Sequence, residues 1–479
     1  MNNEAKQGIY WKSLESVGVQ GVQFIIQLVL ARILLPADFG VVAILNVFVN
    51  LANTLVQNGL GSAILQKKNP QIEDFATVFY IEIWVSLFGY FLIFMCANAI
   101  ANYYENPDLV LYLRIFSLTI IIRALGSMQN TVLRYRLNFK PSFIANFVGI
   151  LFQGFSGISM ALLGFGVWSL IVSQIVYCTV TTFSLFIFAR WIPRAKFSKN
   201  SFFKLFSFSW KLTVGWIIGT IYQDVFAFVI GKVYDDSTLG YYSKGNTIPN
   251  VINRIVTQVT TGVMFPVISK AQDDIESIRK QTREMLAVSA AVIFPVMAFV
   301  AGAANPIVRL LLTDKWLPAV SIIQIFCIPS SFDVISNANM QSFNAIGHSD
   351  VFLISEVIKK GITFALVIIL AQIDFFLMLI SIAMMSLVSL VINSFFNVKL
   401  LNYTIEHYLA DLLPSIGFSL VVFCCTFVLN YLIPQLILRL LSQAILSVLL
   451  YFIVAQTELI KPCSQVWIAV RELMMRRRV

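Results

Sequence analysis

The stretch LARILLPADFGVVA, Leu30 to Ala43, lies between two long apolar runs. Pro36, Asp38 and Gly40 are typical of a tight turn that ends one helix and starts the next. Arg32 stands in the last turn of the first run, where the helix dipole favours a cation. The stretch therefore predicts a helical hairpin, and Arg32 is either part of this turn or a functional charge.

The composition around this hairpin is that of an integral membrane protein. Of 479 residues, 58% are hydrophobic and 12% charged, whereas a soluble domain is about one quarter charged. A bilayer-spanning helix needs roughly 20 apolar residues, and such runs recur along nearly the whole chain. We expect an all-α polytopic membrane protein with about fourteen spans. They cover residues 16–35, 40–64, 76–100, 110–133, 142–163, 167–190, 208–231, 244–268, 285–313, 317–345, 352–372, 374–400, 409–430 and 434–457.

The basic residues predict the orientation. Most of the 34 Lys and Arg residues fall at alternate joints, and such a bias marks the cytoplasmic side. This predicts an even number of spans with both termini in the cytoplasm. The net charge of +10 is scattered over these joints and is not interleaved with exposed aromatic residues, so no nucleic-acid partner is indicated.

An internal repeat starts from the same hairpin. Placed over the sequence 200 residues later, the stretch from Gln23 to Asn53 shows six identities, and Arg32 meets Lys232. The identical pairs are Gln23 and Gln223, Val29 and Val229, Gly40 and Gly240, Asn46 and Asn246, Asn50 and Asn250, and Asn53 and Asn253. A second match, at an offset of 210, places Arg123 on Asp333.

The repeat predicts two six-helix lobes in the same orientation, related by a pseudo-twofold axis along the membrane normal, with a cavity between them. The expected division is an N-lobe at 1–195, a cytoplasmic linker at 196–207 and a C-lobe at 208–403. Residues 404–479 supply two further helices and a basic cytoplasmic tail.

Polar residues inside the spans are the candidate site. A charge at a helix centre costs about 2.5 to 3.5 kcal/mol even on a lenient scale, so it usually faces protein or water. The substrate-binding candidates are Arg123, Arg254, Asn46, Asn50, Asn53, Asn130, Asn337 and Gln341. The ion-coupling candidates are Asp224, Asp333 and Glu82.

Structural alternatives stay open for these residues. Arg123 either binds a phosphate or carboxylate in a hydrated cavity or pairs with Asp333, and Asp224 and Arg254 could instead neutralise each other. Glu82 could be a solvated residue, and the asparagines could serve only to hold helices together. A cluster at Glu356, Lys359 and Lys360 is most simply an intrahelical ion pair whose lysines extend to the membrane surface.

Enzyme chemistry is not indicated. The two histidines, His348 and His407, and the six cysteines show neither metal-ligand nor paired-thiol spacing. The sequence contains no Walker loop, nucleophile elbow or paired-carboxylate motif. We expect no catalytic residue, no metal and no cofactor.

Several motifs together resemble those of a known family. They are WKSLESVGVQGVQFIIQLVLARILLPADFGVVAI from Trp11, NGLGSAILQKKN from Asn58, LRYRLNF from Leu133, GFGVWSL from Gly164 and LGYYSKGNTIPN from Leu239. The chain is similar to the Wzx-type polysaccharide flippases of the multidrug/oligosaccharidyl-lipid/polysaccharide exporter superfamily.

The resemblance implies twelve core helices plus two, in the bacterial inner membrane. It also implies transport of an undecaprenyl-pyrophosphate-linked oligosaccharide by alternating access coupled to an ion gradient, with a glycan polymerase and other assembly proteins as candidate partners beside bilayer lipids. The alternatives are a lipid II flippase, a multidrug or small-solute antiporter, and a membrane-embedded glycan polymerase.

Overall fold

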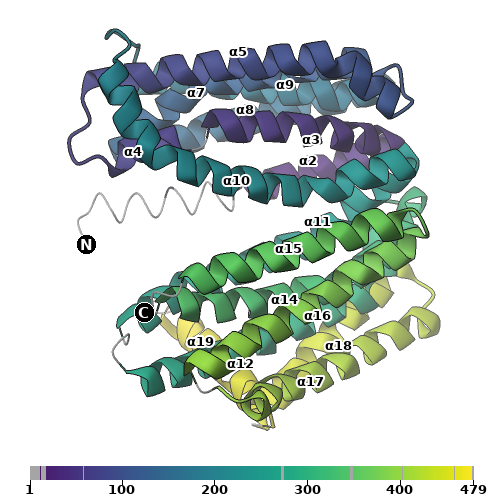
Figure 1. Ribbon diagram of the computed structural model, residues 1–479. Coiled ribbons are helices and arrows are strands. Elements are labelled where there is room, and N and C mark those ends of the chain that lie inside the picture. The colour runs from purple at the N-terminus through teal and green to yellow at the C-terminus, as the bar shows by residue number, and fades with distance from the viewer. Residues whose placement is uncertain are drawn as a thin grey trace. The chain divides into compact units, whose positions relative to one another are not determined.

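The computed structural model describes residues 11, 18–57, 59–270, 274–345, 349–401, 403–457 and 459–476. Every regular element in these ranges is a helix (Figure 1), which confirms the expected all-α class. The helices of the first half are α2 (Gln20–Ile33), α3 (Pro36–Gln57), α4 (Leu60–Gln66), α5 (Ile72–Tyr103), α6 (Leu109–Phe116), α7 (Leu118–Tyr135), α8 (Lys140–Leu162), α9 (Val167–Ala189) and α10 (Lys199–Val233). Those of the second half are α11 (Asp236–Lys270), α12 (Ile275–Gly302), α13 (Ala304–Leu311), η2 (Asp314–Trp316), α14 (Ala319–Ala345), α15 (Ser349–Ala371), α16 (Phe375–Leu401), α17 (Ile405–Leu432), α18 (Leu436–Gln456) and α19 (Lys461–Arg476).

Within the described residues, eleven helices are long and apolar enough to cross a membrane. The three other predicted spans coincide with α2, α11 and α15. The described part of α2 has 14 residues, α11 carries Lys244 and Arg254, and α15 carries Glu356, Lys359 and Lys360. These three helices are therefore shorter or more polar, in their described residues, than the eleven, and the count of fourteen stays a prediction.

The helix boundaries follow the internal repeat. α2 ends at residue 33 and α10 at residue 233, while α3 begins at 36 and α11 at 236. Likewise α7 ends at 135 and α14 at 345. Both halves then continue with two further helices, α8 and α9 in the first and α15 and α16 in the second. The offsets of 200 and 210 in the sequence thus correspond to matching elements.

The two hairpins of the repeat use different capping chemistry for the same turn. In the first, the backbone N–H of Leu35 donates to Asp38 Oδ2 at 2.8 Å, and Pro36 occupies the first helical position, where its missing N–H costs nothing. In the second, the carboxylate of Asp235 accepts from the backbone N–H of Thr238 at 3.2 Å. Each arrangement satisfies an N–H group at the start of the second helix of its hairpin.

Gly40 and Gly240 hold these two hairpins against each other. A Cβ atom built on Gly40 would overlap the backbone carbonyl of Asp236, and one built on Gly240 would overlap the carbonyl of Pro36. The contact is reciprocal, as a duplicated hairpin requires, and only glycine permits backbones to approach so closely. The two glycines that meet in the sequence repeat therefore have the same structural role.

Contacts between residues divide the chain into two compact units, residues 1–240 and 241–479. α10 belongs to the first unit, where it packs on α3, α4 and α5. It begins at Lys199, so most of the stretch 196–207, expected to be a linker, is helical. The division into lobes at 1–195, 208–403 and 404–479 is based on the sequence repeat and stays a prediction.

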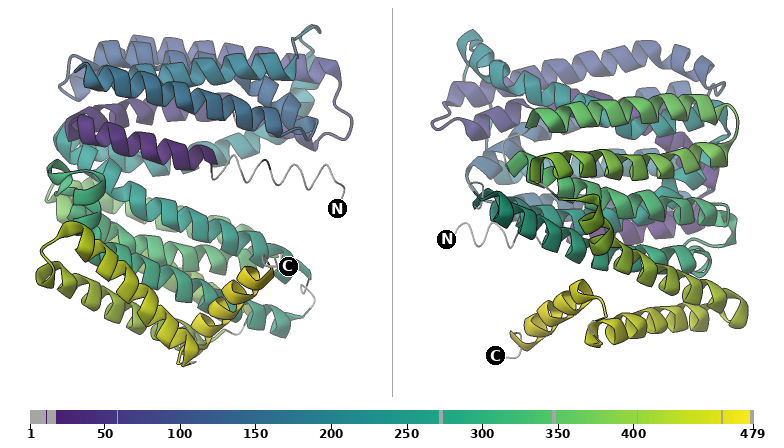
Figure 2. Two further views of the ribbon diagram at one scale, coloured as in Figure 1. Left: turned by 180° about the vertical axis from the view of Figure 1, so that it is seen from behind. Right: turned by 60° about the horizontal axis from the view of Figure 1, so that its bottom comes forward.

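The second unit differs from expectation in two places. α12 begins at Ile275, ten residues before the predicted ninth span, because Asp274 caps it by accepting from the N–H groups of Glu276 and Ser277. The predicted basic tail contains α19, which packs on α12 and α18 and runs obliquely to the long helices (Figure 2). Residues 477–479 lie outside the described ones.

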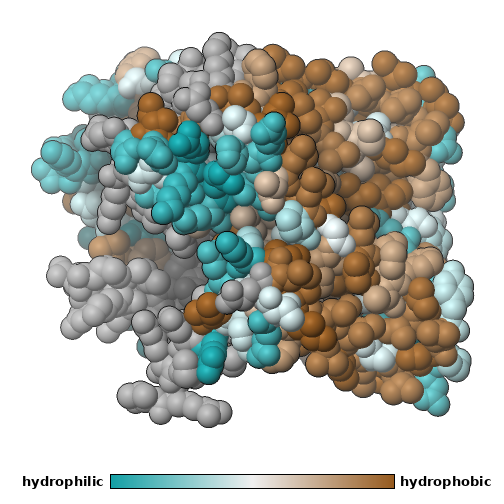
Figure 3. All heavy atoms as spheres, turned by 90° about the horizontal axis from the view of Figure 1, so that it is seen from below, coloured by the Kyte–Doolittle hydropathy of each residue, from teal (hydrophilic) through white to brown (hydrophobic). Residues whose placement is uncertain are grey.

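The surface has the polarity of a membrane protein. Figure 3 shows one face on which hydrophobic residues form a broad, continuous area and hydrophilic residues gather toward one end. The exposed apolar side chains include Leu420, Tyr431 and Val448, which are 61%, 79% and 69% exposed. An exposed apolar area of this extent is typical of contact with lipid.

Candidate functional site

One residue of the asparagine stripe of α3, Asn50, contacts α10. Asn50 lies within hydrogen-bonding reach of Asp224, and one turn further along, the hydroxyls of Thr54 and Thr220 are 2.9 Å apart. Asn53 is 8% exposed, and its Oδ1 has no hydrogen-bond partner among the described residues. The structure thus brings a predicted binding residue, Asn50, together with a predicted ion-coupling residue, Asp224.

Asn46, the first residue of this stripe, is half-buried on α3. α3 also packs on α5 and α7, whereas Asn50, one turn further along the stripe, is exposed and Asp224 is half-buried.

Glu82 lies deep in α5 and is only 1% exposed, so the solvated alternative for this residue is wrong. Ser127 of α7 is its polar neighbour, but within the described part of the chain neither carboxylate oxygen has a hydrogen bond of good geometry. A buried carboxyl group without a partner is costly. Glu82 therefore remains a candidate for binding a proton or a cation.

The polar residues of α7 contact two different helices. Arg123 is half-buried, and its Nε donates to Cys178 Sγ of α9 at 3.2 Å, which is a weak acceptor. Asn130, two turns on, accepts a hydrogen bond from the Ser142 hydroxyl of α8 at 2.9 Å. Arg123 and Asn130 thus contact different helices, although they share one face of α7.

A charged cluster joins α14, α15 and α16 in the second unit. Lys359 is 6% exposed, and its Nζ lies 2.6 Å from Glu356 Oε1 and donates to Asn393 Oδ1 at 3.2 Å. Asn393 in turn donates to the Ser336 hydroxyl of α14 at 2.6 Å. Asp333, one turn before Ser336, is exposed on α14 and lies in the field of Glu356 and Lys359.

The sequence predicts the pair of Glu356 with Lys359 and Lys360, and that pairing is confirmed. The expected extension of Lys359 to the membrane surface is wrong, because Lys359 turns inward to Asn393. The only signal in the sequence is position: Lys359 falls near the middle of a 23-residue helix, too deep to reach the surface easily.

We expect Lys359→Met to destabilise the protein by about 1 to 3 kcal/mol, since it removes the buried partner of Glu356 and leaves Asn393 Oδ1 without its donor. The matched control is Lys360→Met. This lysine also pairs with Glu356, at 3.2 Å, but is 33% exposed, so its loss should cost about 1 kcal/mol or less. Thermal unfolding of the purified variants measures both, and equal shifts in Tm would contradict the buried role of Lys359.

The asparagine stripe of α11 has other contacts. Asn250 donates to Asn246 Oδ1 at 2.9 Å, and Asn253 donates to the carbonyl of Ser330 on α14 at 2.8 Å. Arg254 is exposed on α11. Its predicted pairing with Asp224 joins the two units and stays a prediction, as does that of Arg123 with Asp333.

Two further predicted residues lie on α14. Asn337 is half-buried, whereas the side chain of Gln341 lies outside the described ones. Sequence reasoning missed their neighbour Asn339, which is fully buried and accepts hydrogen bonds from Asn397 at 2.9 Å and Tyr408 at 2.8 Å. These bonds join α14 to α16 and α17. No spacing of residues along the chain predicts such contacts between helices.

Lys232, the cation in the last turn of α10, has contacts beside this turn. Lys232, the counterpart of Arg32, lies 2.8 Å from Glu105 Oε1 and 5.1 Å from the centre of the Tyr103 ring. The hydrogen bond from Lys232 holds the pKa of Glu105 below its ordinary value. The ion pair of Lys232 with Glu105 thus supports the interpretation that the cation at this position is part of the turn.

A family model for polysaccharide biosynthesis proteins matches residues 29–321, more than half of the chain. The chain belongs to the polysaccharide biosynthesis protein family. The family membership confirms the resemblance drawn from the motifs at Trp11, Leu133 and Leu239.

The chain is similar in sequence to two proteins of polysaccharide biosynthesis. It is 27% identical over 310 residues to the succinoglycan biosynthesis transport protein of Rhizobium meliloti (strain 1021), covering 65% of this chain and 63% of that one. It is 24% identical over 327 residues to a lipopolysaccharide biosynthesis protein of Escherichia coli (strain K12), covering 67% and 66%. The matched part thus spans about two thirds of the length of these relatives.

The fold of this polysaccharide biosynthesis protein is similar to two solved structures. The lipid II flippase MurJ in an inward closed conformation superposes with a TM-score of 0.77 at 15% identity, over 97% of this chain and 100% of that one. An inward-facing multidrug resistance transporter of the MATE family gives 0.63 at 13% identity, over 83% and 99%. At such identities the likeness is one of fold.

Proposed function

We propose that this protein moves an undecaprenyl-pyrophosphate-linked oligosaccharide repeat unit from the cytoplasmic to the periplasmic leaflet of the bacterial inner membrane. The product would serve lipopolysaccharide, capsule or exopolysaccharide assembly. The observation that carries this proposal is the family match over residues 29–321 in a chain made of membrane-spanning helices. The relatives named for succinoglycan and lipopolysaccharide biosynthesis support the substrate class.

The polar residues of the spans suit such a substrate. Arg123 and Arg254 would bind the pyrophosphate, because guanidinium groups pair well with phosphate oxygens. The asparagine stripes of α3 and α11 would hydrogen-bond sugar hydroxyls while the lipid tail stays in the bilayer. Asp224, Asp333 and Glu82 are the candidates for coupling transport to an ion gradient. Alternating access would take place between two duplicated lobes.

The protein would lie in the inner membrane and work with other proteins of glycan assembly. Both termini would be cytoplasmic, because most basic joints then lie inside. A glycan polymerase and other assembly proteins would receive or deliver the substrate. The protein would act as a transporter and not as an enzyme, without a cofactor.

Transport by the purified protein in sealed vesicles tests the proposal. A fluorescent undecaprenyl-pyrophosphate-linked saccharide in the vesicle membrane should become accessible to a membrane-impermeant quencher or lectin on the opposite side faster than in protein-free vesicles. Labelled lipid II and a cationic dye are the comparison substrates. Preferred movement of lipid II would favour a lipid II flippase, and movement of the dye alone would favour a drug antiporter.

A further inference from the structure

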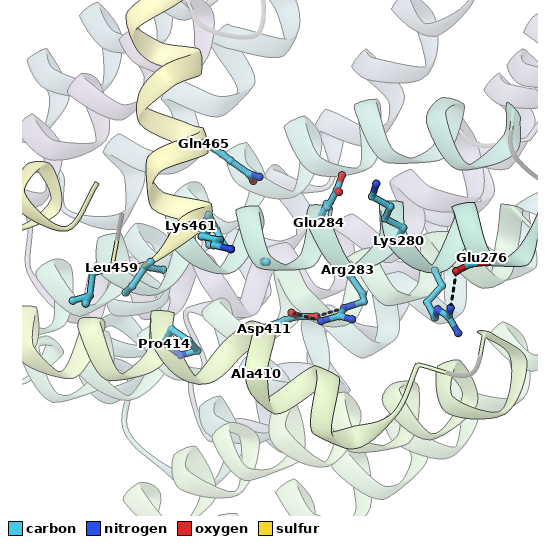
Figure 4. Close-up of a pocket in the computed structure, with 14 residues that line it drawn as sticks. Glu276, Lys280, Arg283, Glu284, Ala410, Asp411, Pro414, Leu459, Lys461 and Gln465 are labelled. Atoms are coloured by element: carbon cyan, nitrogen blue, oxygen red, sulfur yellow. Dashed lines mark hydrogen bonds and ion pairs between the residues drawn. The ribbon is translucent and has the colours of Figure 1, made fainter. Parts of the chain in front are cut away.

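A polar pocket of about 650 Å³ lies at one end of the second unit (Figure 4). The first turns of α12 and α17 and the start of α19 line it. Its charged side chains include four cations and three carboxylates. They are Arg279, Lys280, Arg283, Lys461, Glu276, Glu284 and Asp411. This pocket differs from two other pockets lined by described residues of the unit, whose walls are almost entirely apolar.

Some of these charges already have partners. Arg283 makes a bidentate ion pair with Asp411, at 2.8 Å from Nε to Oδ2 and 3.0 Å from Nη2 to Oδ1. The Tyr403 hydroxyl donates to the same carboxylate at 2.6 Å, and burial together with this bond raises the pKa of Tyr403. Arg279 lies 3.5 Å from Glu276. These pairs form a wall of the pocket, in which Arg283 and Asp411 hold each other through two hydrogen bonds.

Two cations and one carboxylate remain. Lys280 and Lys461 make no ion pair with a described residue, and neither does Glu284. Lys280 and Glu284 project one turn apart from α12, while Lys461 lies at the start of α19 (Figure 4). All three are exposed. A ligand that carries both a phosphate and a primary ammonium group would match this set.

Exposed leucines lie at the pocket or next to its lining residues in the chain. Leu459, which lines the pocket, is 77% exposed, and Leu409 and Leu413 of α17, beside the pocket residues Ala410 and Pro414, are 50% and 53% exposed. Exposed leucines next to lysines are typical of the boundary between acyl chains and headgroups. A lipid headgroup in the pocket could thus keep its chains on the leucine surface.

We propose that this pocket binds the phosphoethanolamine headgroup of a membrane phospholipid. Lys280 and Lys461 hold the phosphate, and Glu284 accepts hydrogen bonds from the ammonium group. The site is separate from the residues that would bind the transported glycan and does not depend on which substrate the protein moves.

The charge pattern favours this headgroup over others of the bilayer. Phosphatidylglycerol lacks an ammonium group and would leave Glu284 facing a net negative headgroup. Phosphatidylcholine carries a quaternary ammonium, which has no N–H to donate to Glu284. Of these three lipids, we therefore expect phosphatidylethanolamine to bind best, because it alone offers both a phosphate to the two lysines and N–H donors to Glu284.

Native mass spectrometry of the purified full chain with each lipid in turn tests the site. Lys280→Gln combined with Lys461→Gln should weaken phosphatidylethanolamine binding about 10-fold or more, since two charge-assisted bonds are lost. Lys280→Arg with Lys461→Arg should retain binding. Glu284→Gln should remove the preference for phosphatidylethanolamine over phosphatidylglycerol. Lys68→Gln with Lys196→Gln, at exposed lysines of the first unit, is the matched control.

Unchanged binding in the double glutamine variant, or equal binding of the three lipids to the wild-type protein, would overturn the proposal. Inorganic phosphate and soluble glycerophosphoethanolamine are added as competitors. Displacement of the lipid by glycerophosphoethanolamine at lower concentration than by phosphate is expected. Displacement by phosphate alone would assign the pocket to a free anion and contradict the lipid site.

Discussion

Replacing Arg123 by alanine is expected to abolish glycan export while the protein still inserts at normal abundance. Arg123 is half-buried in α7, and its described hydrogen bond, to the thiol of Cys178, does little to offset the charge. An arginine inside a span costs about 2.5 to 3.5 kcal/mol. We infer that this cost is offset by binding the pyrophosphate of the substrate.

Two variants separate binding from structure. Arg123→Lys keeps the charge but loses the planar, bidentate geometry, so partial export is expected. Arg309→Ala is the control, because Arg309 pairs with Asp314 at the surface, with side chains 45% and 76% exposed, and its loss should leave export unchanged. The measurements are surface glycan and membrane abundance of the protein. Near-normal export by Arg123→Ala would exclude this role.

Gly40→Ala is expected to have the second large effect, a destabilisation of about 3 kcal/mol through overpacking. The added methyl group would overlap the backbone carbonyl of Asp236, which cannot move aside as a flexible side chain would. Gly240→Ala should cost about as much, because its methyl group would meet the carbonyl of Pro36 in the same way. Both variants should also reduce export.

Thermal unfolding in detergent measures this effect, and other glycines supply the controls. Gly21 and Gly219 lie in α2 and α10 with no heavy atom within 4 Å of an added Cβ, so their alanine variants should be neutral or about 0.5 to 1 kcal/mol more stable. The double variant of Gly40 and Gly240 should cost less than the sum of the single ones, because both disrupt one contact. Wild-type stability of Gly40→Ala would refute the close approach of the hairpins.

Parts of the candidate site were predictable because the repeat can be recognised from identical residues at a fixed offset in the sequence. The asparagine spacing of Asn46, Asn50 and Asn53 placed them on one face of α3, and Asn50 indeed lies by Asp224. Glu82 was identified as an intramembrane carboxylate, but its burial was not. Helix spacing gives the face on which a residue lies, whereas its exposure depends on what packs against that face.

Other features were out of reach for a single sequence. α12 begins early because Asp274 caps it. The many charged residues that follow Asp274 are typical of a loop between spans, so hydropathy placed the start of the span ten residues later. The inward turn of Lys359 depends on Asn393, 34 residues away. The pocket around Arg283 and Asp411 joins residues 128 positions apart, and α19 completes it.

By itself, the sequence determined the class of the protein, most of its membrane spans, the duplicated hairpin and the resemblance to its family. These properties depend on hydropathy, turn residues and repeated motifs, all of which are local or repeat at a fixed offset. Only the tertiary structure decided that Gly40 meets Asp236, that Lys359 is buried against Asn393, and that Lys280, Glu284 and Lys461 share a pocket. The reason is physical: a charge or a glycine acquires its role from groups brought near it by packing, and those groups are distant in sequence.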